Sequence, residues 1–556
     1  MKMNKTPEEI FKEYSKCEQY NVSLDLYETV KKNENFYIGR QWEGVNAPDL
    51  DKPVLNFLKR VTTYFISMIV SDDIGVSFRF FLERPDSDAV AKMLSREVDR
   101  VIERTRAKAL NREMLKNAVV DGDGCFYLYF DTSVQNGQPI SGEIVIENID
   151  NTKVLFGNPY VSDVQAQPYL LIVKRSLLDT IKEQARQNGV EDIDRITPDD
   201  NRDRFYGEEK DSQNDLVTSI VKLWKQDGVV HYTEVTRDVV IKEETVTGYK
   251  LYPVAYMSWD KVKNSYHGQS AITGLIPNQI FVNKLWAMAM EHQKRMAFPK
   301  LFFDRTKIRK WTNKVGEAIG VEGNPNDAIA SNFRAADMSG QVLELVEKTV
   351  SYTRDFMGAS DAALGNVKPD NTSAIIAVQK ASAAPLELQR LAFYQFIEDY
   401  VRIIVDMMVA NYGLRYVPME QAADMGAAPG MEAEATDGPV LFDFASLNVD
   451  AMELNVDVGT SAYWSELTQL STNDNLLLQG ILDKGVIEDC ITYIEGIPDK
   501  QLNNKNKILE RLKQKKAAQE AQAMQAAQMQ QMPQAMPMQG GGMDMGLNQM
   551  MGANMR

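Results

Sequence analysis

Residues 277–296, PNQIFVNKLWAMAMEHQKRM, decide how the fold is interpreted. The stretch predicts one helix of about 20 residues, roughly 30 Å long. A helix that is apolar nearly all round has to be buried, either within one subunit or between subunits. The apolar side chains here fall on several faces: Ile280, Phe281, Val282, Leu285, Trp286, Met288 and Met290.

The chain continues from this helix through an insert, a second helix, a loop and a third helix. Residues 298–340 predict a compact insert with the basic opening FPKLFFDRTKIRKWTNK, and residues 341–357 predict a helix with an apolar stripe. Residues 358–371, GASDAALGNVKPDN, predict a loop because they hold turn formers and a proline. Residues 372–412 predict a very long helix, which Pro385 must kink because proline removes a donor and clashes with the preceding turn.

The segment before residue 277 predicts helices first and strands afterwards. We expect one or two helices at 7–39, a helix at 53–70 with Pro53 in its first turn, and one long charged helix at 89–118. Residues 121–260 predict an α+β region of antiparallel hairpins, because β-branched and aromatic runs alternate with Gly, Asn and Pro. The expected strands are 125–130, 143–149, 153–156, 169–173, 217–224, 229–235, 239–245 and 253–259, with a helix at 176–187 and a two-residue turn at Asp227-Gly228.

The C-terminal part has mixed patterns and then a biased composition. From Ala517 the chain is almost entirely Gln, Met, Ala and Gly, which offers little to offset the entropy of ordering, so we expect disorder there. Before it we expect a surface loop at 418–440, strands within 440–458, two short helices in 467–494 broken at Gly485, and a basic helix at 502–516.

Length and charge limit the classes of protein to consider. The chain has 556 residues, beyond the ~250–300 at which a single core stops growing, so we expect about two to four packed regions. A formal net charge of −16 argues against a surface that grips phosphates everywhere, and it permits a protein past which DNA slides. The three cysteines are far apart, and no apolar run approaches the ~20 residues of a membrane helix. We therefore expect reduced thiols and no membrane span.

No residue pattern predicts an enzyme. The sequence has no phosphate-binding P-loop, and its three histidines leave little room for a Ser/His/Asp group. Residues 121–124, DGDG, resemble the start of a calcium loop, but the twelfth position is Thr132 and not Glu, so a β-turn is the preferred interpretation. Asp199, Asp200 and Asp203 lack the rigid elements that a two-metal site needs. We expect no catalytic residue, no metal and no cofactor.

Two basic stretches interrupt this acidic chain. Each can be a solvated helix face or a subunit contact, and each can meet an acidic partner or DNA phosphates. The first comprises Lys294, Arg295, Lys300, Arg305, Lys307, Arg309, Lys310 and Lys314, and the second Lys505, Lys507, Arg511, Lys513, Lys515 and Lys516.

The order of elements after residue 270, together with several short phrases, resembles the portal proteins of tailed bacteriophages. Residues 358–366 and 371–375 resemble the portal pattern around the tunnel loop and the start of the next helix. The resemblance covers about residues 30–500 and rests on the order of its phrases. The others are 35–42 (NFYIGRQW), 53–56, 157–159 (GNP), 266–270, 275–283 and 480–482.

The resemblance implies a non-enzymatic subunit of a ring, a dodecamer or a ring of about twelve copies, around an axial DNA channel at one capsid vertex. The implied partners are other copies, the terminase large subunit, the major capsid or scaffolding protein, a head-completion or adaptor protein, and double-stranded DNA without sequence preference. The implied location is the virion, and the host cytoplasm during assembly. The implied regions are a wing at 1–270, stem helices at 271–297 and 341–358, a clip at 298–340, a tunnel loop at 359–371, a long wing helix with return strands at 372–459, a crown at 460–516 and a disordered tail at 517–556.

The resemblance also implies two sets of site residues. A channel for a moving polyanion must not bind it tightly, so only a few cations at a constriction should touch the duplex. On the tunnel loop, Lys368 is the candidate contact, beside Asn366, Asp370 and Asn371. On the clip, charge complementarity to a docking partner speeds encounter and fixes register. The candidate clip residues are Arg305, Lys307, Arg309, Lys310 and Lys314.

Three other functions stay open at the level of sequence. They are another structural or adaptor protein of the phage particle, a metal-dependent nuclease or nucleotidyltransferase, and a cytoplasmic scaffold unrelated to phage. Particle images with a central hole favour the ring, whereas Mg²⁺- or Mn²⁺-dependent cleavage of plasmid DNA favours the enzyme.

Overall fold

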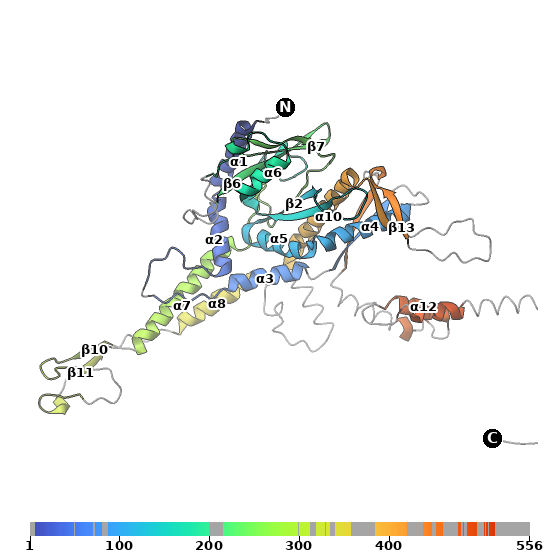
Figure 1. Cartoon of the computed structure of the whole chain (residues 1–556). Helices are drawn as coiled ribbons and strands as arrows, with labels where there is room; N and C mark the ends of the chain where they lie inside the picture. The colour runs from blue at the N-terminus through green and yellow to red at the C-terminus, as the bar shows by residue number, and fades with distance from the viewer. Residues whose placement is uncertain are drawn as a thin grey trace, which may run out of the picture. The chain divides into compact units, whose positions relative to one another are not determined.

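The computed structural model in Figure 1 divides into two units, Met1–Gly459 and Thr460–Arg556. Each unit is described by itself. The described residues of the first unit are 6–48, 50–70, 73–80, 87–199, 215–297, 300–311, 319–327, 330–333, 340–356, 358, 384–419, 438–447 and 452–459, and those of the second are 476–479, 482, 486–497, 505, 507–509 and 511–516.

The N-terminal segment at 7–39 forms two helices, which confirms the helical prediction. α1 (Pro7–Ser23) starts with proline at its first position, and the Thr6 side chain accepts a hydrogen bond from the backbone of the first turn at 3.4 Å. α2 (Leu26–Ile38) ends at Gly39, whose φ of 98° stops the helix in the left-handed region.

The next helix, α3 (Phe57–Val70), begins later than the sequence suggested. Asn56 caps it, because its side-chain oxygen accepts a hydrogen bond from the backbone N–H of Lys59 at 3.0 Å. The expectation that Pro53 lies in the first turn is therefore wrong, since the described backbone is not helical before Phe57.

The single helix expected at 89–118 is also wrong. The segment forms α4 (Ser87–Arg104) and α5 (Ala107–Asp121), and Arg106 adopts a left-handed φ of 54° between them. The break lets α5 run in a different direction from α4, and Ala107 at the start of α5 is fully buried. Both sides of the break keep helical periodicity, so the pattern alone does not reveal it.

The strands expected at 121–260 form two antiparallel sheets, which confirms an α+β region. One sheet has the order β3-β2-β9 and the other β4-β5-β6-β7-β8. Asp227 and Gly228 form the expected two-residue turn, with φ values of 53° and 81° that match a type I′ hairpin. The bounds are β2 (Asp123–Asp131), β3 (Glu143–Ile149), β4 (Val154–Phe156), β5 (Tyr169–Leu177), α6 (Leu178–Gln187), β6 (Leu216–Gln226), β7 (Val229–Val235), β8 (Val240–Val246) and β9 (Val254–Ser258).

A long helix closes the main core against the three-stranded sheet. This is α10 (Glu387–Asn411), which lies across β2 and β9 (Figure 1). Phe126 of β2 meets Phe396 edge-on with ring centroids 5.0 Å apart, and both rings are 1% exposed or less. Pro385 lies in a 3-10 turn (Ala384–Leu386) just before α10, and the preceding residues 359–383 fall outside the described part, so the expected kink stays a prediction.

Four further strands follow or flank this core in antiparallel pairs. β12 (Leu414–Met419) pairs with β13 (Gly438–Asp443), so both ends of the loop expected at 418–440 are strand, and residues 420–437 lie outside the described part. β1 (Asp73–Phe80) pairs with β14 (Met452–Gly459), which agrees with the strands expected within 440–458.

The helices expected around the insert are also present. α7 (Ile276–Ala297) and α8 (Gln341–Phe356) match the predicted bounds closely. Between them in sequence, β10 (Lys300–Phe303) and β11 (Ala330–Phe333) pair in antiparallel fashion.

The second unit is described only in short segments. α12 (Ile487–Glu495) agrees with a helix expected in 467–494, and the break expected at Gly485 lies outside the described residues. The described residues between 505 and 516 are helical, as expected. The Gln/Met-rich stretch 517–556 lies outside the described residues, so its expected disorder stays a prediction.

Candidate functional site

α7 and α8 pack side by side through one face of each helix (Figure 1). The start of α7 lies against the end of α8, where the Asn278 side-chain amide donates a hydrogen bond to the Thr353 hydroxyl at 3.1 Å. Val282 and Val346 join a small core that also takes in residues of α2 and α3. Each helix is thus anchored along one face by its own chain.

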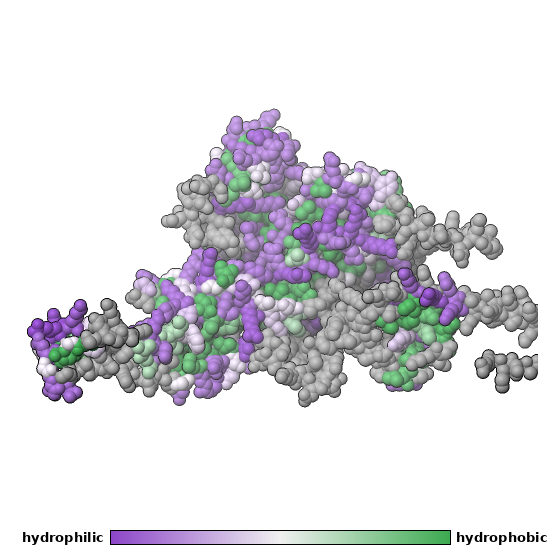
Figure 2. Space-filling view, turned by 60° about the horizontal axis from the view of Figure 1, so that its bottom comes forward, coloured by the Kyte–Doolittle hydropathy of each residue, from purple (hydrophilic) through white to green (hydrophobic). Residues whose placement is uncertain are grey.

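The opposite faces of both helices keep large apolar side chains in solvent. Phe281 and Met288 on α7 are 42% and 63% exposed, and Leu345 and Tyr352 on α8 are 46% and 58% exposed. Each pair is spaced by seven residues and therefore shares one face of its helix. Figure 2 shows apolar side chains at the surface over this helix pair. The single chain does not bury α7 all round, and exposed apolar patches of this kind mark interaction sites.

A buried amide cluster fixes α7 to the segment before α3. The Asn283 amide donates to Gln41 Oε1 at 2.6 Å, and its oxygen accepts from Gln279 Nε2 at 2.9 Å. Gln279 also donates to the Leu55 carbonyl at 2.8 Å, and all three amide side chains are 7% exposed or less. This cluster was not predicted from the sequence, although two amides four residues apart on an apolar helix are a usable signal.

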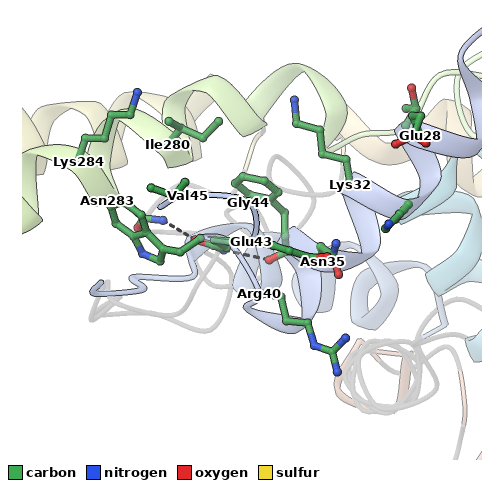
Figure 3. A pocket seen from close by; sticks show the side chains of 15 residues that line it. Glu28, Lys32, Asn35, Arg40, Glu43, Gly44, Val45, Ile280, Asn283 and Lys284 are labelled. Atoms are coloured by element: carbon green, nitrogen blue, oxygen red, sulfur yellow. Dashed lines mark hydrogen bonds between the residues drawn. The ribbon is translucent and has the colours of Figure 1, made fainter. Parts of the chain in front are cut away.

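A cleft of about 580 Å³ opens beside this cluster, between α2, residues 40–45 and α7. Its apolar lining comes from Phe36, Trp42, Val45 and Ile280. Figure 3 shows Val45 and Ile280 in this lining. The lining also holds four cations and two carboxylates: Lys31, Lys32, Arg40 and Lys284, with Glu28 and Glu43.

Four of the five basic residues expected in the insert are described. Lys307 donates to the Asp327 carbonyl at 2.7 Å, and Arg309 forms an ion pair with Glu322. Arg305 and Lys310 are exposed and have no ion pair within the described part of the chain. The fifth residue, Lys314, lies outside the described residues.

The basic segment is shaped by a tight turn. The Asp304 carboxylate accepts hydrogen bonds from the backbone N–H and the hydroxyl of Thr306, at 2.9 and 2.6 Å. These bonds lower the pKa of Asp304 below its ordinary range. The Phe303 and Trp311 rings stack at 5.7 Å beside the turn. The exposed cations here therefore sit on an ordered turn.

The residues expected in a channel loop cannot be placed. Asn366, Lys368, Asp370 and Asn371 all lie outside the described residues. Gly358, at the entrance of that loop, is described and has a φ of 72°, which a residue with a side chain rarely adopts.

The second basic stretch is held partly by its own unit. Lys516 forms an ion pair with Glu488 of α12 at 2.7 Å, and Lys505 donates to the Ile497 carbonyl at 2.7 Å. These contacts join two helical segments of the second unit and lessen the charge offered to an external partner.

The most enzyme-like group in the chain is buried. His267 Nδ1 lies 2.9 Å from the Asp123 carboxylate, and its Nε2 lies 3.1 Å from the Asn21 side-chain oxygen. His267 and Asp123 are 4% and 1% exposed, so substrate has no access to them. The cluster joins α1 and β2 to the segment after β9.

The DGDG segment at 121–124 is neither a calcium loop nor the β-turn that the sequence suggested. Asp121 ends α5, Gly122 caps it with a φ of 102°, and Asp123 begins β2. A side chain at Gly122 would approach the Gly268 carbonyl to 2.6 Å, so the close packing there requires glycine.

The described residues offer neither a metal site nor a membrane-spanning helix. They contain no group of three or more His, Cys, Asp or Glu side chains that could hold a metal ion. No helix within those residues is both long and apolar enough to cross a bilayer. Cys17, Cys125 and Cys490 are free thiols.

No protein-family model matches the chain, and no curated protein matches it. The function therefore has to be argued from the α7/α8 pair, the cleft beside it and the basic insert.

Proposed function

We propose that this chain is a portal subunit of a tailed bacteriophage, one of a ring of copies around a channel for DNA packaging and ejection. The observation that carries the proposal is the uncovered apolar face of α7 and α8. Fully burying one large apolar side chain contributes about 1.5–3 kcal/mol, so several of them on each copy favour association. Contacts between unlike faces, repeated from copy to copy, close into a ring when the rotation between copies allows it.

The order of elements supports a portal over another oligomer. An α+β region is followed by helix, small hairpin insert and helix, and then by the long helix α10 and a separate C-terminal unit. This order is the one on which the resemblance to portal proteins rests. In the proposed ring α7 and α8 are the stem, and the insert between them is the clip.

The charge of the chain suits a channel wall. With 62 basic and 78 acidic residues, most of the surface does not hold phosphates. A duplex that moves through such a ring makes few strong contacts, so each step of its movement has few contacts to break. We propose that Lys368, beside Asn366, Asp370 and Asn371, supplies the few direct contacts.

The basic turn of the insert supports a docking role. Arg305 and Lys310 are exposed on a turn that Asp304 holds in place. We propose that they, with Lys307, Arg309 and Lys314, meet an acidic surface of the terminase large subunit or of a head-completion protein. Rim charges of this kind act mostly on the rate of encounter.

Deleting residues 360–370 tests the proposal in a packaging reaction with the matching terminase and procapsids. We expect rings to assemble and DNA packaging or retention to fail, because the channel contact is removed and the α7/α8 faces are kept. Replacing the same residues with a Gly/Ser linker of equal length controls for chain length. Normal packaging by the deletion variant would contradict the tunnel-loop assignment, and absence of rings from the unaltered chain would contradict the proposal itself.

A further inference from the structure

The cleft beside α7 has the features of a site for a protein segment. About 580 Å³ is within the range of volumes that binding pockets have. Its apolar lining comes from Phe36, Trp42, Val45 and Ile280, of which Figure 3 labels Val45 and Ile280. Trp42 is held in place because its indole N–H donates to the Pro53 carbonyl at 2.8 Å. The lining is therefore formed before anything binds.

Positive charge around the cleft is available to a ligand. Lys32, Arg40 and Lys284 are exposed, and none of them forms an ion pair within the part of the chain that the structure describes. With Lys31 they outnumber the two carboxylates of the lining by four to two. In a chain of net charge −16, this local excess of cations favours an acidic partner surface.

Several features argue against a phosphate backbone as the occupant. Glu28 and Glu43 line the cleft together with the cations and repel phosphate. Phe36, Trp42 and Ile280 offer a nucleic-acid backbone no hydrogen bond inside the cleft. An apolar side chain flanked by carboxylates fits this cleft, because it can pack on the apolar lining while the carboxylates pair with the cations.

The outer face of α8 presents such a group. Tyr352 is 58% exposed, and Leu345 lies seven residues before it on the same face. Asp355 is exposed three residues after Tyr352 on this side of the helix, and exposed Glu344, eight residues before Tyr352, pairs with Lys348. Tyrosine is among the residues that most often dominate the binding energy of an interface.

We infer that the cleft of one copy receives the Tyr352 face of α8 from the next copy. The inference deepens the proposed function, because it rests on a ring and assigns one of its contacts. No described residue of α8 lines the cleft of its own chain, so the two patches are different surfaces. A contact between unlike patches repeats from copy to copy, and it closes into a ring when the rotation allows.

In this contact the Tyr352 ring packs on Trp42 and Ile280, and its hydroxyl stays at the wet edge. Glu344 and Asp355 of the entering helix, on the same side as Tyr352, face Arg40 and Lys284 of the receiving copy. The charges fix the register of the two helices, and the apolar side chains supply most of the affinity.

A charge-swap series tests the pairing. We expect Arg40→Glu with Lys284→Glu to raise the protein concentration for half-assembly by roughly tenfold or more, because like charges then face one another. Glu344→Lys with Asp355→Lys should do the same. The chain with all four changes should regain assembly, which a merely misfolded variant cannot do. Lys261→Glu with Lys263→Glu, on an exposed loop, is the matched control and should assemble normally.

A crosslink identifies the occupant directly. Val45→Cys in the cleft and Lys348→Cys, one turn before Tyr352 on α8, placed in one chain, should give a ladder of disulfide-linked copies under mild oxidation. Each single variant and the parent chain, with its three native cysteines, are the controls.

The outcomes separate this contact from the proposed ring. Rings that form normally from the cleft variants, with no ladder from the double-cysteine chain, overturn the contact and leave the proposed function standing. Crosslinking of Val45→Cys to a different segment overturns it too. A parent chain that never assembles overturns both.

Discussion

α10 and α7 have similar hydrophobic patterns but differ in how many of their residues are buried within their own chain. Both carry apolar side chains on several faces. Eleven of the 25 residues of α10 are buried in its own chain, including Phe396 and Tyr400, but only five of the 22 residues of α7 are. The hydrophobic pattern of a helix therefore predicts that the helix is buried, but it does not predict whether the same chain or a neighbouring copy buries it. α10 completes a core, and α7 leaves one face for a neighbour.

Truncating an aromatic side chain in the core around α10 should have the largest effect on stability. Phe396→Ala removes a side chain that is 1% exposed and packs on Phe126, and we expect a loss of about 4 kcal/mol in the free energy of unfolding. Met288→Ala on α7, 63% exposed, should change it by less than ~0.5 kcal/mol. Denaturant unfolding below the concentration of association measures both. Equal losses for the two variants would erase the distinction between the helices.

The core also holds a buried charge cluster whose loss should come next in size. Glu143 of β3 forms ion pairs with Arg104 of α4 and, at 2.8 Å, with Arg415 of β12. Glu143→Gln leaves Arg415, which is 2% exposed, without its counter-charge, so we expect a loss of about 3 kcal/mol. Glu147→Gln, exposed on the same strand, is the control and should be nearly neutral.

The same cluster gives a pH dependence. Burial opposes ionisation of Glu143, but hydrogen bonds from Asn136 and Arg104 and the charge of Arg415 outweigh it, so its pKa lies below the ordinary 4.5. A depressed pKa stabilises the fold above about pH 4.5, and this contribution is lost as the pH falls through the folded value. Unfolding followed from pH 6 to pH 3 should show a steeper loss for the parent chain than for Glu143→Gln. Parallel curves would contradict the charge assignment.

A smaller effect is expected where the α7/α8 pair joins the core. Asn283→Ala removes the amide that donates to Gln41, so a buried acceptor is left unpaired at a cost of about 2 kcal/mol. In this variant we also expect faster amide hydrogen exchange in α7 than in α10. The substitution weakens the contact between α7 and the segment that holds Gln41, and it leaves the core around α10 unchanged. Gln293→Ala, exposed on the same helix, is the control. A uniform change across both helices would show that they unfold as one body.

The smallest effect is expected at the two-residue turn between β6 and β7 of the five-stranded sheet. Gly228 has a φ of 81°, and Gly228→Ala should cost about 1 kcal/mol, because a side chain is strained in the left-handed region. Asp227→Asn should be nearly neutral, since asparagine tolerates that region. A thermal unfolding midpoint that does not move for Gly228→Ala would argue against the type I′ turn.

Local chemistry explains what the sequence predicted well. The hairpin at Asp227-Gly228, the strand at 143–149 and the bounds of α7 each depend on residues close in the chain, and each is confirmed. The α4/α5 break was missed because helical periodicity continues through Arg106. The DGDG segment was misread because its geometry depends on Gly268, more than 140 residues away in the sequence.

The candidate site was predicted only in part for the same reason. The basic run from Arg305 to Lys310 is contiguous and visible in sequence, although the ion pair between Arg309 and Glu322 is not. The cleft combines α2, residues 40–45 and α7, which no local pattern links. Lys368 and its neighbours stay a prediction, since they lie outside the described residues.

The central claim is that the apolar faces of α7 and α8 are covered by other copies of this chain. Sedimentation of the purified chain, beside a Phe281→Glu, Met288→Glu variant, tests it most directly. We predict one large closed species for the parent chain and a folded monomer for the variant, because two carboxylates cannot enter an apolar contact without partners. A parent chain that sediments as a monomer at every concentration and salt would contradict the account.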